Sequence, residues 1–156
     1  MKKLLITFLS LLGLTFALPG HALTAAGTFN VNLTLTSKCE INSTAAATGA
    51  LITDLAMSYT SFQASAATGS TSFNVRCTSS LPYTVALDSA TVTDNALNLV
   101  YDLSLVAPVG GGTGTGLNQG YTVNGSIAAG QGGACATASC TNAAATNKQR
   151  TLTITY

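Results

Sequence analysis

Hydrophobic and polar residues alternate strictly along one short stretch near the N-terminus. Within Thr28–Thr36, hydrophobic side chains occupy every second position (Phe29, Val31, Leu33 and Leu35), and each residue between them is Thr or Asn. Successive side chains of a β-strand point to opposite faces, so the four hydrophobic side chains would share one face. The stretch is therefore predicted to be a β-strand with one apolar face.

The rest of the chain predicts further short strands and no long helix, because no 3.6-residue hydrophobic period is sustained. We expect strands over Ala50–Tyr59, Thr71–Cys77, Tyr83–Leu87, Leu97–Val106, Tyr121–Ile127 and Thr151–Tyr156. Turn-rich segments separate them at Asn42–Gly49, Ala64–Ser70 and Ala107–Gly120, and short alanine runs at 45–47 and 143–145 could form at most a helical turn. This spacing is typical of an all-β antiparallel sandwich.

Residues 1–22 have the three parts of a secretory signal peptide. Two lysines precede an uncharged apolar run over Leu4–Leu18, and Pro19 is followed by small residues at Gly20 and Ala22. The run is short for a membrane span, which disfavours the alternative of an uncleaved anchor. Removal of the signal from the 156 residues would leave 134, enough for one domain, and the product is expected to be exported.

The exported part carries little charge. It has four Lys and Arg residues against five Asp and Glu residues, which gives a net charge of −1. No basic patch for nucleic acid and no polybasic stretch for a membrane surface is present. The surface is expected to consist mainly of Thr, Ser, Asn, Ala and Gly.

The four cysteines all lie after the signal, and an even number in an exported chain indicates disulfides. Three pairings are possible. Cys135 and Cys140 are close neighbours in a Gly- and Ala-rich loop, so we pair them, which leaves Cys39 with Cys77. A four-thiolate zinc site is the alternative, and the absence of a Cys-x-x-Cys spacing disfavours it.

No catalytic constellation is evident. The only histidine is in the signal, so Ser-His and Cys-His nucleophiles are excluded from the exported part. Asp88 and Asp94 are interpreted as turn residues, and the few scattered acids disfavour a two-carboxylate glycosidase or a metal site. The segment Gly110–Gly116 lacks the Lys-Ser or Lys-Thr of a phosphate-binding loop and is predicted to be flexible. We expect no enzyme, no cofactor and no small-molecule substrate.

Several segments in order resemble the spore coat protein U domain family, which includes subunits of archaic chaperone–usher pili. They are the alternating strand that ends at Cys39, Ser72–Cys77, Tyr83–Asp88, Leu99–Leu105, Tyr121–Gln131 and the alternating end Arg150–Tyr156. The resemblance covers nearly all of the exported chain. The Cys135–Cys140 pair is a departure from it, and its role is left open.

The resemblance implies an incomplete immunoglobulin-like sandwich of six strands, completed by donor-strand exchange. Residues 23–36 would be the donor strand, with Phe29, Val31, Leu33 and Leu35 entering the groove of a neighbouring subunit, and residues 37–156 the domain. A periplasmic chaperone would pair with the last strand, facing Leu152, Ile154 and Tyr156, and an outer-membrane usher would assemble a surface fibre for adhesion and biofilm formation.

Three alternatives stay open. Residues 28–36 could be the first strand of the same domain in a closed, monomeric sandwich. The protein could be a secreted binding module that acts as a monomer, although it has no Trp and only scattered Tyr residues for a binding surface. It could also be a spore or cell-coat protein that uses the same strand-exchange chemistry.

Overall fold

The computed structural model describes residues 24–41 and 52–156, so the signal segment and the turn-rich segment 42–51 lie outside the described residues. The chain divides after Thr34 into an N-terminal unit, described from Thr24, and a domain. The elements of the domain are β1 (Cys39–Ile41), β2 (Ala67–Cys77), β3 (Thr84–Leu87), β4 (Thr91–Asp94), β5 (Leu99–Val106), β6 (Gln119–Ile127), the 3₁₀ turn η1 (Asn142–Ala144) and β7 (Leu152–Thr155).

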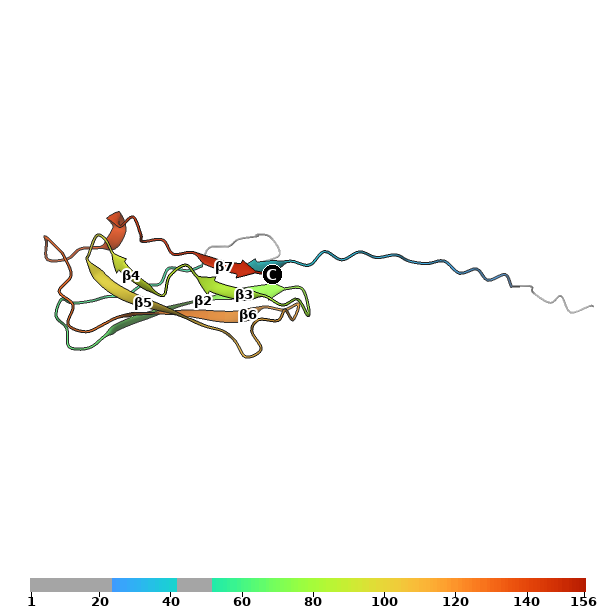
Figure 1. Cartoon of the computed structure of the whole chain (residues 1–156), viewed down its shortest axis with the longest axis horizontal. Helices are drawn as coiled ribbons and strands as arrows, with labels where there is room; N and C mark the ends of the chain where they lie inside the picture. The colour runs from blue at the N-terminus through green and yellow to red at the C-terminus, as the bar shows by residue number, and fades with distance from the viewer. Residues whose placement is uncertain (1–23, 42–51) are drawn as a thin grey trace, which may run out of the picture. The chain divides into compact units, whose positions relative to one another are not determined.

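The strands form two antiparallel sheets (Figure 1). One has five strands in the order β1-β2-β6-β5-β4, and the other consists of β3 and β7 alone. The predicted all-β antiparallel sandwich is confirmed, and an immunoglobulin-like arrangement fits it. The described residues form seven strands rather than the six that the resemblance implied.

The core lies on the inward face of β2 and β6. Phe73 of β2 is paired with Tyr121 of β6, and their rings stack at 5.5 Å. The Tyr121 hydroxyl donates to the Tyr83 hydroxyl at 2.9 Å, which donates to Oε1 of Gln119 at 3.1 Å. Burial raises the pKa of Tyr121 well above its usual value, and the hydrogen bond to Tyr83 raises it further.

The predicted strand Ala50–Tyr59 is wrong for its described part. Residues 52–59 belong to no ladder, although half-buried and exposed side chains alternate along 55–59. The segment crosses the inward face of the five-stranded sheet where β2 and β6 pair Gly69 with Gly125. A Cβ at Gly69 would lie 2.3 Å from the Ala56 carbonyl oxygen, so glycine is required there. Alternation predicted an extended chain correctly, but a chain that lies across a sheet face has no strand to pair with.

The glycine-rich segment Gly110–Gly116 was predicted to be flexible, and the structure instead holds it by backbone hydrogen bonds to residues 77–83. The amide of Tyr83 donates to Gly112 at 2.9 Å, Gly114 donates to Leu81 at 2.7 Å, and Gly116 donates to Cys77 at 3.0 Å. A Cβ at Gly114 would lie 2.1 Å from the Thr78 carbonyl oxygen. The glycines therefore allow two backbones to approach closely at one end of the sandwich.

Other errors concern strand boundaries. Ala64–Ser70 was predicted to be a turn, but β2 already begins at Ala67 because its first residues pair with the end of β6. The strands β1 and β4 were missed, since each is only three or four residues long. Asp94 ends β4, and its carboxylate accepts from the Ala96 and Leu97 amides, which is the turn role expected of it.

Both predicted disulfides are confirmed. Cys39–Cys77 joins β1 to the end of β2, whose residues are paired in the same register, and Cys135–Cys140 closes a short exposed loop. The first disulfide joins cysteines that are 38 positions apart in the sequence, and the second joins cysteines that are 5 positions apart.

Replacement Gly114→Ala is expected to lower the free energy of unfolding by about 3 kcal/mol, because the new methyl group meets a backbone carbonyl that cannot move aside. The matched control is Gly120→Ala, where a Cβ would have its nearest neighbour 3.7 Å away, at Oδ1 of Asn74. Urea unfolding of the exported chain measures both. Equal stability of the two variants would contradict the close approach.

Removal of Cys39–Cys77 as a double Ser variant is expected to cost about 4 kcal/mol, and removal of Cys135–Cys140 about 2 kcal/mol, since the longer loop restricts the unfolded chain more. The comparison is made by urea unfolding of the two double variants against the unmodified chain. The reverse order would show that loop length does not set the contribution of these bonds.

Candidate subunit interface

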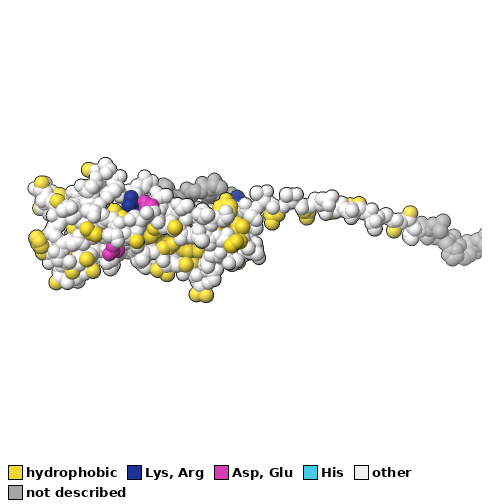
Figure 2. Space-filling model, viewed as in Figure 1, with side chains coloured by type: hydrophobic (Ala, Val, Ile, Leu, Met, Phe, Trp, Pro, Cys, Tyr) yellow, Lys and Arg dark blue, Asp and Glu magenta, His cyan; other side chains and the backbone are white. Residues whose placement is uncertain are grey.

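The inward face of the two-stranded sheet is only half-buried. Val85 of β3 lies directly opposite Ile154 of β7, and Leu87 lies opposite Leu152, so the four side chains share one face. All four are partly exposed, whereas Phe73 and Val75 on β2 are 3% and 0% exposed. We call the four residues Val85, Leu87, Leu152 and Ile154 the open face. In the space-filling view, hydrophobic side chains gather over the half of the domain that carries β3 and β7 (Figure 2).

The inward face of the five-stranded sheet is also incompletely buried. Tyr101 and Leu105 of β5 point inward and pack against the core cluster, yet each is only partly buried, while Leu103 between them is 7% exposed. Two strands therefore cover less inward surface than five strands present. Apolar surface left in water costs about 25 cal/mol per Å², which favours any additional strand that covers it.

The outer edge of β7 lies next to the open face. The Asp88 amide donates to the Thr151 carbonyl at 3.0 Å, so Thr151 and every second residue after it direct their main-chain groups toward β3. The main-chain groups of Leu152 and Ile154 consequently point away from β3. In residues 24–41 and 52–156 we find no hydrogen-bond partner for them. An unpaired edge of this kind is a template for another strand.

None of the four residues of the open face is charged. On the opposing strand β5, burial raises the pKa of the Tyr101 hydroxyl above its usual value. The nearest ion pair of β7 joins Arg150 to Asp88 at 3.5 Å and fixes the start of the strand against the end of β3. The face therefore suits an apolar occupant that also supplies main-chain hydrogen bonds.

The alternating segment 28–36 presents the complementary chemistry. It belongs to no ladder among the described residues and runs as an extended chain (Figure 1). Its four hydrophobic side chains are strongly exposed: Phe29 86%, Val31 69%, Leu33 89% and Leu35 81%. Such a row of apolar side chains is unusual on a solvent-exposed segment, and exposed apolar surface of this kind is typical of association sites.

The remaining candidate residues are placed as follows. Leu152 and Ile154 are part of the open face, whereas Tyr156 follows β7 and is 60% exposed. Sequence reasoning missed Val85 and Leu87 as members of the same surface. Their alternation within a predicted strand was visible, but only the register of β3 with β7 brings them opposite Ile154 and Leu152.

Neither a metal-binding group nor a membrane-crossing helix is found among the described residues. No group of three or more His, Cys, Asp or Glu side chains could hold a metal ion there, and no helix there is long and apolar enough to cross a bilayer. The Glu40 carboxylate bonds to Lys38 and, at 2.8 Å, to Arg76, so these charges beside the first disulfide pair with one another.

Comparison with known protein families shows to which family the chain belongs. The family model of the spore coat protein U domain matches residues 25–102, which is half of the 156 residues. The chain belongs to the spore coat protein U domain family. This family consists of exported structural subunits of coats and pili and is not a family of enzymes. No curated protein and no solved structure shows a significant match.

The part matched to the spore coat protein U domain includes the alternating segment, both cysteines of Cys39–Cys77 and the strands β1 to β4. The strands β6 and β7 and the Cys135–Cys140 loop lie beyond it. Half of the open face, on β3, is therefore inside the matched part, and half, on β7, is outside.

Replacement Ile154→Ala is expected to lower the free energy of unfolding of the monomeric chain by about 1 kcal/mol, because its side chain is only partly buried. The matched change Ile127→Ala removes the same atoms from a site that is 5% exposed and is expected to cost about 3 kcal/mol. Urea unfolding measures both variants. Equal losses would show that the open face is as well packed as the core.

Proposed function

We propose that this protein is a structural subunit of an exported surface fibre, in which the alternating segment of one copy completes the open face of the next. One observation carries the proposal. A half-buried apolar face lies beside a strand edge that has no partner among the described residues, and the same chain presents four strongly exposed hydrophobic side chains at strand spacing. Membership of a structural family supports it.

The chemistry of the two surfaces matches. A strand added beside β7 would use the free main-chain groups of Leu152 and Ile154, and its alternate side chains would lie against the open face. Burial of the four hydrophobic side chains is worth on the order of 6–12 kcal/mol before the cost of ordering the segment. This strand addition uses residues 23–36 as donor and residues 37–156 as acceptor.

The contact joins two different surfaces of the chain, so copies associate head to tail and form a fibre rather than a closed ring. A subunit with an uncovered face is prone to aggregation before assembly. A periplasmic chaperone therefore protects β7 in transit, and an outer-membrane usher assembles the fibre at the cell surface, where it serves adhesion and biofilm formation.

Replacement Leu33→Arg is expected to abolish assembly, because an arginine in the middle of the apolar row would place a charge against the uncharged open face. The exported chain is co-expressed with its periplasmic chaperone and examined by size-exclusion chromatography and by unboiled, non-reducing gels. The unmodified chain is expected to form a ladder of denaturant-resistant multimers that the variant lacks, while both form the chaperone complex.

The matched control is Thr34→Arg, which adds the same charge on the polar face of the same segment and is expected to leave the ladder intact. Stable, chaperone-free monomers from the unmodified chain would overturn the fibre and favour a monomeric secreted module.

A further inference from the structure

The five-stranded sheet has its own exposed edge at β4, and polar side chains occupy that edge. The Leu103 amide donates to the Ala90 carbonyl at 2.6 Å, and Val92 and Asp94 follow in the same phase of the ladder toward β5. The main-chain groups of Thr91, Thr93 and Asn95 therefore point outward, away from β5. Without partners they would form a second template for strand addition.

A single side-chain amide bonds to this edge at two points. The Asn147 Nδ2 donates to the Thr93 carbonyl, and the Asn147 Oδ1 accepts from the Asn95 amide at 3.3 Å. A carboxamide has a donor and an acceptor in the arrangement of a peptide group, so Asn147 takes the place that a neighbouring strand would take. The Ser89 hydroxyl donates to the next outward carbonyl, that of Thr91, at 2.7 Å.

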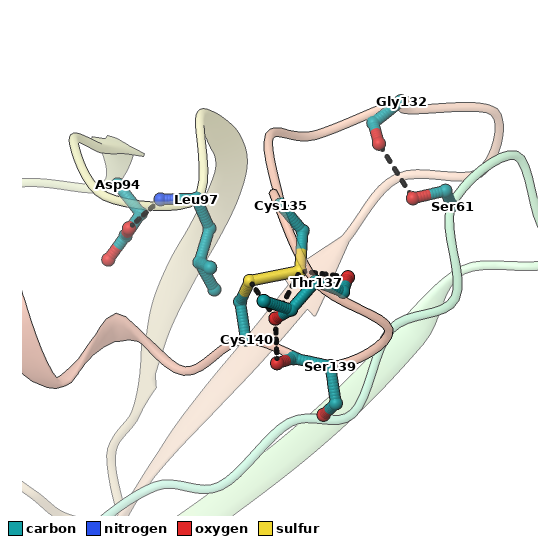
Figure 3. Close-up of a disulfide and its surroundings, with 8 residues drawn as sticks. All are labelled: Ser61, Asp94, Leu97, Gly132, Cys135, Thr137, Ser139 and Cys140. Carbon is teal, nitrogen blue, oxygen red and sulfur yellow. Dashed lines mark hydrogen bonds between the residues drawn. A yellow bond between two sulfur atoms is a disulfide. The ribbon is translucent and has the colours of Figure 1, made fainter.

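Further contacts hold the segment that carries Asn147 against the β4–β5 hairpin. The Asn95 side chain donates to the Thr146 hydroxyl at 2.8 Å, next to Asn147. Upstream, the Ala134 amide donates to the Leu97 carbonyl at 2.6 Å in the turn of the hairpin. Figure 3 shows the Cys135–Cys140 disulfide beside this turn, where Leu97 also donates to Asp94.

The other edges differ from this one. The outer edge of β7 has no partner among the described residues, and β1 at the far side of the large sheet is only three residues long, which itself limits strand addition. We propose that Asn147 blocks the edge of β4, so that strand addition takes place at the two-stranded sheet, where the proposed function uses β7. The part of this inference that concerns β7 rests on the proposed function, whereas the blocking of β4 does not.

The test uses the full exported chain with Leu33→Arg, so that copies cannot associate through the alternating segment 28–36. Adding Asn147→Ala is expected to raise the association constant about tenfold, measured by sedimentation over a range of concentrations, because outward main-chain groups of β4 become free. The control is Asn142→Ala in the same segment, whose side chain makes no hydrogen bond to any residue in the described part of the chain; it is expected to stay monomeric.

A rescue variant separates edge pairing from partial unfolding. Thr93→Lys places a charge on the exposed face of β4, which natural edge strands use against pairing, and is expected to return the Asn147→Ala chain to monomers. Hydrogen exchange of the Asn95 amide is followed by NMR. It is expected to be about tenfold faster when Asn147→Ala is added to the Leu33→Arg parent, because the Asn95 amide has then lost its acceptor.

Two results would overturn the block. If Asn147→Ala stays monomeric while the Asn95 amide exchanges faster, the edge needs no protection. If association persists with Thr93→Lys, it does not use β4. A failure of the fibre itself is seen separately, as the absence of multimers from the chain without Leu33→Arg.

Discussion

The five-stranded sheet has more inward-facing apolar surface than two strands and the crossing segment 52–59 can cover. Fully buried side chains such as Phe73 and Val75 mark the covered part, and the half-buried open face marks the rest. The sandwich packs only as well as its smaller layer allows. Under the proposed function, a further strand that covers this surface would stabilise the domain and join it to the subunit that supplies the strand, so stability and association would be linked.

Other contacts fix the two sheets of the domain in this incompletely covered arrangement. The disulfide Cys39–Cys77 fixes β1 to the end of β2, and the glycine-rich segment is bonded to residues 77–83 at one end of the sandwich. Because the chain has few charged residues, charge repulsion contributes little to preventing strands of other molecules from pairing with its sheet edges. Edge protection by hydrogen bonds, which we propose for Asn147, therefore matters more here than in a highly charged protein.

Local patterns determined much of this protein from the sequence by itself. The alternation in Thr28–Thr36 identified the apolar row, the closeness of Cys135 to Cys140 identified their disulfide, and the repeated short apolar runs identified the sandwich. Each of these depends on residues close together in the chain, where strand period, turn chemistry and loop length act directly.

Only the tertiary structure decided which strands pair and which strand edges have no partner within residues 24–41 and 52–156. Residues 52–59 have a strand-like alternation, yet they form no ladder and cross a sheet face, where the Gly69–Gly125 pair leaves room for them. Asn147 bonds to Thr93 across 54 residues, and the open face exists because β3 and β7 meet in one register. Pairing and burial are set by contacts between distant segments, and no local period encodes them.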